Sequence, residues 1–113
     1  MQTPEPAATP LTPAVFHVLM ALSDGPLHGY AVMKRVEEES GIQMGPGTVY
    51  GSLQRLEDAG WVSAGSTDER DARRGRAFEL TASGRGSLVV EARRIARLSR
   101  LVDERGLLVD TGT

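Results

Sequence analysis

The chain has 113 residues, a formal net charge of -2 at pH 7 and no cysteine. This length predicts a single domain with a modest hydrophobic core, which oligomerisation would help to stabilise. The lack of cysteine excludes disulfides, cysteine-based zinc sites and thiol nucleophiles, and it fits a reducing cytoplasm.

Membrane insertion and secretion find no support in the sequence. The longest apolar run, from Val15 to Leu22, is too short to span a bilayer. The N-terminal residues lack the basic region of a secretion signal. We therefore expect a cytoplasmic protein with no membrane partner.

The charged residues are unevenly distributed along the chain. One group of arginines comprises Arg70, Arg73, Arg74 and Arg76, and a second comprises Arg93, Arg94, Arg97 and Arg100. Acidic residues gather elsewhere, at 37–39 and 57–58. A protein of nearly neutral net charge can still bind DNA through such a local cluster, because the affinity arises from phosphate contacts within the footprint.

The first predicted helix follows a proline-containing arm over residues 1–11, which has no hydrophobic periodicity and which we expect to be disordered. Thr12 and Pro13 are a typical helix start, a hydroxyl cap followed by proline at the first helical position. Apolar residues then recur at helical spacing until Asp24-Gly25-Pro26 ends the helix.

Two further helices are predicted next. The second runs from about His28 to Ser40 and is closed by Gly41. The third runs from about Gly45-Pro46 to Gly60, with an inner apolar stripe at helical spacing. Its other face carries small and polar residues: Gly47, Gly51, Gln54, Arg55 and Asp58, flanked by Thr48 and Ser52.

The segments 61–64 and 77–80 predict two paired strands, and the mostly polar segment 65–75 predicts a long hairpin tip between them. Thr81 can cap a final helix from Ala82 to about Gly106. Its apolar residues have near-heptad spacing and predict a dimerisation face. That face comprises Leu88, Ala92, Ile95, Leu98 and Val102. Packing against the first helix of the same chain is the alternative, and the two roles can be shared.

Three helices followed by a ribbon predict a mainly α fold with a small two-stranded β wing, a winged helix-turn-helix with a C-terminal dimerisation helix. The arm then covers residues 1–11, the DNA-binding domain 12–81, the dimerisation helix 82–108 and a frayed tail 109–113.

In this fold the third helix enters the major groove of DNA, with its apolar stripe buried. Glycine at 47 lets the backbone approach phosphate, and the free amides of a helix start favour an anion. We expect contacts from Gly47, Thr48, Tyr50, Ser52, Gln54 and Arg55, and sequence-independent affinity from the wing residues Arg73, Arg74 and Arg76. The alternatives are an ordinary surface helix and a solvated loop.

Several motifs occur in an order that resembles the PadR family of bacterial transcriptional regulators. They are His28-Gly29-Tyr30, Pro46-Gly47-Thr48-Val49-Tyr50, Leu53-Gln54-Arg55-Leu56-Glu57 and the segment 76–84. The resemblance covers about residues 13–90 and suits the small, short-C-terminus subgroup.

The resemblance implies a winged-helix dimer, usually a repressor at a palindromic promoter site. It also implies that Thr48 and Tyr50 lie at the DNA backbone and that the final helix forms the dimer. Gly51 stands where the family usually has proline, and Gly45 where it usually has a serine-like helix cap. Some members bind planar aromatic drugs or phenolic acids, so a small aromatic effector is a further expectation.

Other interpretations stay open beside this one. The winged helix could contact a protein partner instead of DNA. Tyr30 is expected in the core rather than at DNA, and Trp61 is also expected in the core. His17 and His28 have no matching ligand spacing, and no catalytic constellation is present, so we expect neither an enzyme nor a metal or other cofactor.

Overall fold

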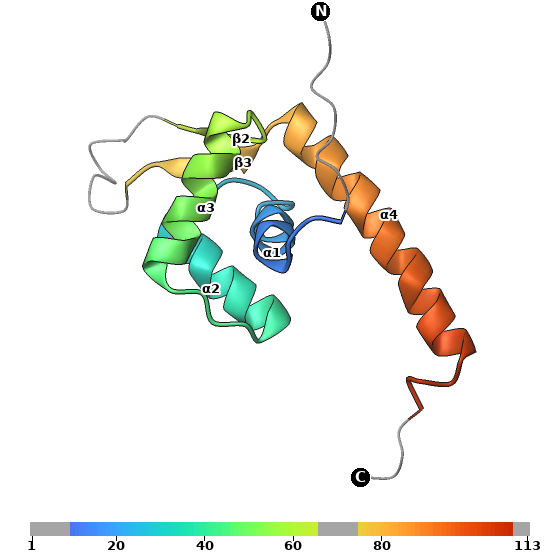
Figure 1. Cartoon of the computed structure of the whole chain (residues 1–113). Coiled ribbons are helices and arrows are strands. Elements are labelled where there is room, and N and C mark those ends of the chain that lie inside the picture. Colours follow the sequence, from blue (N-terminus) through green and yellow to red (C-terminus); the bar gives the residue numbers. More distant parts are fainter. Residues whose placement is uncertain (1–9, 66–74, 110–113) are drawn as a thin grey trace, which may run out of the picture.

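The computed structural model describes residues 10–65 and 75–109 (Figure 1). Its elements are α1 (Pro13–Ala21), β1 (Leu27–His28), α2 (Gly29–Ser40), α3 (Pro46–Asp58), β2 (Val62–Ala64), β3 (Ala77–Leu80) and α4 (Ala82–Glu104). The predicted wing residues Arg73 and Arg74, and most of the predicted arm and tail, lie outside the described residues. The segment from α1 to β3 forms one body, here called the winged body, and α4 extends away from it (Figure 1).

The three β segments form a single antiparallel sheet in the order β1-β3-β2. Leu27 lies opposite Phe78, and Val62 lies opposite Leu80. The predicted two-stranded wing is present as β2 and β3. The sheet has a third strand, β1, which was not predicted because two residues are too few to show the alternation that marks a strand. His28 belongs to this short strand and precedes α2, whose first residue is Gly29.

Side-chain caps and glycines place the helix ends as predicted. The Thr12 hydroxyl accepts a hydrogen bond from the amide of Val15 at 3.3 Å, and Thr81 does the same for Gly84 at 3.0 Å. Gly41 follows α2 with a φ of 74°, a left-handed conformation that favours glycine. Helix α2 ends at Ser40 as expected, whereas α3 ends at Asp58 and α4 at Glu104, each two residues earlier than expected, which is the usual uncertainty at helix ends.

The core lies between the first three helices and the sheet. It comprises Val18, Leu19, Ala21, Leu22, Val32, Val36, Met44, Val49, Leu53, Leu56, Trp61, Val62, Phe78 and Leu88. The expectation that Trp61 is a core residue is confirmed. Tyr30 is 61% exposed, so its expected place in the core is wrong. The buried face of α2 carries Val32 and Val36, and a residue two positions before Val32 points to a different side of the helix.

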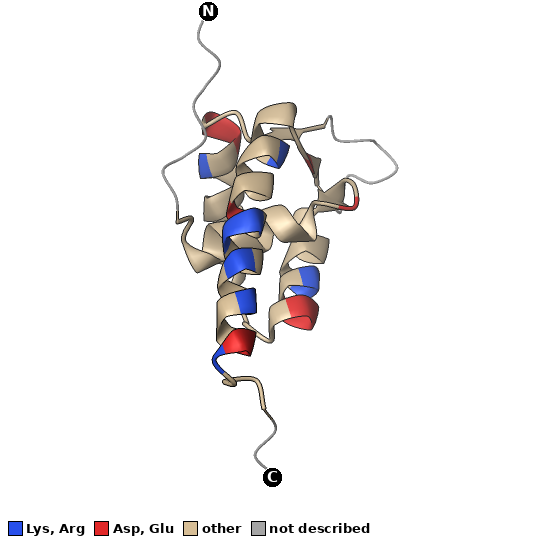
Figure 2. Ribbon diagram, turned by 90° about the vertical axis from the view of Figure 1, so that its right-hand side faces the viewer, with Lys and Arg blue, Asp and Glu red and all other residues tan. Residues whose placement is uncertain are grey.

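The apolar face of α4 divides into two parts. Leu88 is buried in the core of its own chain, so the expectation that it lies in a dimer contact is wrong. Helix α4 packs against α1 of the same chain. Ile95 and Leu98 are 37% and 41% exposed. Figure 2 shows basic residues repeated along α4, and Arg93, Arg97 and Arg100 are exposed there.

None of the helices in the described residues has the length and apolar character needed to cross a membrane.

Candidate nucleic-acid interface

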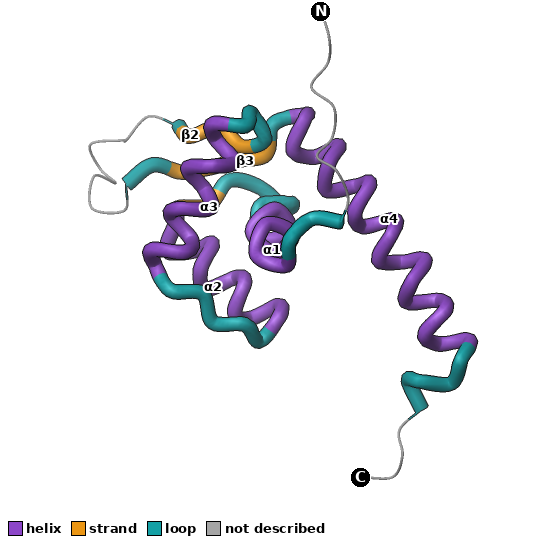
Figure 3. The backbone as a smooth tube through the Cα atoms, viewed as in Figure 1, coloured by secondary structure: helices purple, strands orange, loops and turns teal. Residues whose placement is uncertain are grey.

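Helix α3 lies on the outside of the winged body, between α2 and the β2–β3 ribbon (Figure 3). Val49, Leu53 and Leu56 are buried and hold one side of the helix in the core. The residues Gly47, Thr48, Tyr50, Gln54 and Arg55 are exposed on the remaining surface. The structure therefore brings five of the six contact residues expected on this helix onto one accessible helix surface.

The start of α3 offers unpaired backbone donors. Gly45 is the cap residue and has no side-chain oxygen, and Pro46 has no amide hydrogen. The first amides of a helix have no partner within the helix, so those of Gly47 and Thr48 face outward. A glycine at position 47 adds no side chain that would keep a phosphate at a distance.

Tyr50 is held by a close contact between α3 and the start of α2. Its ring lies directly against Gly29, where a Cβ atom would overlap the ring carbons and the hydroxyl oxygen. The side chain is nevertheless 47% exposed. Gly29 is thus a positioning residue for Tyr50, a role that sequence reasoning missed although Gly29 belongs to the motif His28-Gly29-Tyr30.

Substituting Gly29 by alanine is expected to push the Tyr50 ring away from α2. Because that ring is half-exposed and can rotate outward, the cost in stability should stay below about 1.5 kcal/mol, as for a tolerated surface rearrangement. Tyr50 fluorescence quenching by iodide should increase, measured in a background of Trp61→Phe and Tyr30→Phe that leaves Tyr50 as the one remaining tyrosine or tryptophan of the chain. The matched change Gly51→Ala, which meets no atom within 4 Å, should leave the quenching unchanged; equal quenching in both variants would contradict this account.

Ser52 does not lie on the exposed face. Its side chain is 1% exposed, so the expected phosphate contact is wrong. Position 52 lies on the helix face between the core residues Val49 and Leu56, which places its hydroxyl inside. The Ser52 hydroxyl accepts a hydrogen bond of 3.5 Å from the Arg55 guanidinium and so helps to orient that exposed side chain.

Gln54 and Asp58 form a pair on the surface of α3, with the Gln54 amide donating to the Asp58 carboxylate at 3.1 Å. The residues are one helical turn apart, and both are exposed. This exposed contact pairs the Gln54 amide with a carboxylate of its own helix.

Arg76 connects the wing to α3. Its guanidinium lies 3.4 Å from the Glu57 carboxylate, and its Cζ atom lies 5.9 Å from the centre of the Phe78 ring. The side chain is 45% exposed, so it can still reach an anion. The pairing with Glu57 was not predicted, because the two residues are 19 positions apart.

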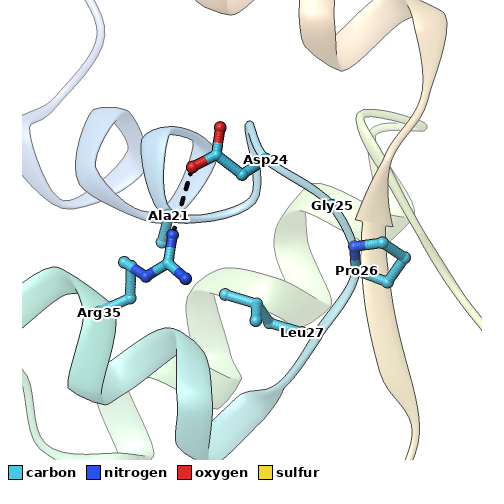
Figure 4. A pocket seen from close by; sticks show the side chains of 6 residues that line it. All are labelled: Ala21, Asp24, Gly25, Pro26, Leu27 and Arg35. Atoms are coloured by element: carbon cyan, nitrogen blue, oxygen red, sulfur yellow. Dashed lines mark ion pairs between the residues drawn. The ribbon is translucent and has the colours of Figure 1, made fainter.

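A small pocket lies at the turn between α1 and β1, lined by Ala21, Asp24, Gly25, Pro26, Leu27 and Arg35 (Figure 4). Arg35 and Asp24 form an ion pair of 3.5 Å across it. Its volume is about 70 Å³, whereas small-molecule sites usually measure about 300–1,000 Å³. This pocket is therefore too small to hold the aromatic effector that the family resemblance implies. Among the described residues no three metal-ligating side chains come together.

Two helices packed against a third helix with a polar outer face, together with a small antiparallel sheet, define a winged helix-turn-helix protein. Comparison with known proteins gives the family. The model of the transcriptional regulator PadR-like family matches residues 18–89, and the chain belongs to this family. The family consists of transcriptional regulators, in agreement with the expectation that the chain is not an enzyme.

Two relatives and two solved structures illustrate the similarity. An uncharacterized 37.1 kDa protein in transposon TN4556 of Streptomyces fradiae is 48% identical over 87 residues, which cover 77% of this chain and 24% of that protein. The chain thus spans about a quarter of that relative's length. The transcriptional regulator Rv3488 of Mycobacterium tuberculosis is 31% identical over 88 residues, 76% of this chain and 78% of that protein.

Among solved structures, a PadR family transcription regulator from Clostridium difficile has a TM-score of 0.70 at 21% identity, over 80% of this chain and 95% of that one. The structure of Bacillus subtilis PadR in complex with operator DNA has a TM-score of 0.62 at 26% identity, over 70% of this chain and 46% of that one. These similarities confirm the predicted fold.

Proposed function

We propose that this chain is a DNA-binding repressor that binds a palindromic promoter site as a homodimer. The observation that carries the proposal is the exposed surface of α3, where a helix start with free amides adjoins Tyr50, Gln54 and Arg55. The family and the operator complex of the Bacillus subtilis relative support it.

The proposed contacts divide by chemistry. The amide of Gly47, the hydroxyl of Thr48 and the Tyr50 side chain bind phosphate and set the register of the helix. Gln54 and Arg55 have the length and the paired donors that read base edges in the major groove. Arg76, together with Arg73 and Arg74 outside the described residues, adds affinity that does not depend on sequence.

The proposed dimer forms through the second half of α4. Ala92, Ile95, Leu98 and Val102 lie on one side of this helix, and two of them are exposed in the protomer. Two-fold symmetry then predicts half-sites about one helical turn of DNA apart, ~34–36 Å, or a multiple of it. Release of the DNA by a small aromatic effector stays a prediction from the family resemblance.

Selection of bound sequences from random DNA by the purified protein tests the proposal. We expect enrichment of a sequence with two inverted half-sites. Affinity for the enriched DNA should fall steeply with salt, with a log–log slope that decreases by about 0.9 for each phosphate contact removed. Replacing Arg73 and Arg74 by alanine should therefore lower the slope by about 2 if both bind phosphate.

Arg97→Ala is the matched control, because it removes an exposed arginine from α4 rather than from the wing. Its salt slope should equal that of the unmodified protein. Failure to enrich any symmetric sequence, or an affinity that does not change with salt, would overturn the proposal and favour a protein partner for the winged surface.

A further inference from the structure

Helix α4 is tied to the two ends of α1 by polar contacts. The Arg85 guanidinium donates to the backbone carbonyl of Ser23, just after α1, at 3.1 Å. The backbone amide of Leu11, just before α1, donates to the Glu91 carboxylate at 3.0 Å. Arg85 and Glu91 are six residues apart, or ~9 Å along the helix. Because the two contacts are separated along α4, together they fix both the position and the direction of this helix relative to α1.

At the second attachment, Glu91 is a buried acidic residue whose carboxylate is held by several hydrogen bonds. Its side chain is 2% exposed, yet it carries a carboxylate. Arg94 donates to both carboxylate oxygens, at 2.7 Å from Nε and 3.0 Å from Nη2. These hydrogen bonds hold the pKa of the Glu91 carboxyl below its usual range, which keeps it ionised. A buried charge is tolerated where paired donors satisfy it, and here one donor is the chain segment that enters α1.

A small rotation of α4 at Arg85 and Glu91 causes a larger displacement at the far end of the helix. Thirteen residues separate Glu91 from the helix end at Glu104, which is ~20 Å of helix. A rotation of about 10° at the attachments would therefore displace the end by about 3 Å. Figure 1 shows this part of α4 extending beyond the winged body.

We propose that Arg85 and Glu91 are positioning residues that fix the angle between α4 and the winged body, and thereby the distance between the two α3 helices of the dimer. The inference rests on the proposed function, because it assigns these residues a part in choosing the operator's half-site spacing. A residue that only stabilised the fold would change the affinity for all spacings equally.

The angle itself can be measured within one protomer. The chain has no cysteine, so Ser63→Cys on β2 and Ser99→Cys on α4 accept two spin labels only. Dilution with unlabelled protein isolates the distance within a protomer in pulsed electron spin resonance. We expect one narrow distance distribution, which broadens or shifts by several Å when Arg85→Ala is combined with Glu91→Gln.

Arg85→Ala alone keeps the inference testable if the double variant does not fold, because Arg85 is exposed. It should broaden the distance distribution, or shift it toward the same distances, as the double variant does. Arg97→Gln, on the far part of α4, should leave it unchanged. A narrow, unshifted distribution in a folded Arg85→Ala protein would overturn the inference, whether or not the protein binds DNA.

A series of operators with half-sites moved apart or together by single base pairs then connects the angle to recognition. The unmodified protein should bind one spacing best. In the folded variants, the ratio of dissociation constants between the best and the neighbouring spacings should shrink by about tenfold, on the order of the cost of one mismatched base pair. An unchanged ratio would overturn the inference, whereas loss of binding by the unmodified protein at every spacing would overturn the proposed function.

Discussion

Substituting Gly84 by alanine is expected to destabilise the protein by about 3 kcal/mol, the upper part of the usual range for overpacking. A Cβ atom at position 84 would overlap the backbone carbonyl oxygen of Trp61 and would lie 2.8 Å from its carbonyl carbon. The chain on both sides resists a shift, because the Trp61 amide donates to Leu56 at 2.9 Å and its carbonyl accepts from Thr81 at 3.0 Å. The first turn of α4 would have to move away from the sheet.

Gly86→Ala is the matched control for this prediction. It adds the same methyl group to the same helix, but no atom lies within 4 Å of the added carbon. Because alanine favours helix over glycine, this variant should be more stable than the unmodified protein by about 1 kcal/mol. Unfolding by urea, followed by far-UV circular dichroism, measures both. Equal midpoints for the two variants would show that the contact between Gly84 and Trp61 is not tight.

The local part of the fold could be predicted from the sequence. Thr12 and Thr81 each mark a helix start because a capping hydroxyl acts on an amide three residues later, within the reach of a sequence pattern. The apolar periodicity of α3 likewise identified its buried side. The strand β1 was not predicted, because its two residues are too few to show the alternation of apolar and polar side chains. They are held by pairing with β3, about fifty positions further along the chain.

The candidate site was predicted less completely, for a geometric reason. A helical wheel assigns Ser52 to the edge of the apolar stripe, and only the actual packing of α1 and α2 decides whether that edge is buried. The contact of Tyr50 with Gly29 and the ion pair of Arg76 with Glu57 join separate elements. Leu11 and Glu91 are 80 positions apart. Such contacts depend on the tertiary fold, which a single sequence does not specify at the level of atoms.

Substituting Leu98 by glutamate is expected to convert the proposed homodimer into a monomer. Leu98 is 41% exposed on the apolar side of α4, and a carboxylate there would be desolvated next to its symmetry mate in the dimer. A monomer binds a single half-site, so it loses the effective concentration that links the two contacts. The affinity for the two-half-site operator should fall by about 10²–10⁴-fold.

Val89→Glu separates this effect from the mere addition of a charge to α4. Val89 is 38% exposed, nearly as much as Leu98. It lies nine residues earlier, which places it about 180° around the helix. This variant should remain a dimer in sedimentation velocity and keep its operator affinity within a few-fold. The two variants share the helix, the new side chain and nearly the same exposure, so a difference between them comes from where on the helix the charge is placed. Equal behaviour of the two would place the dimer contact elsewhere.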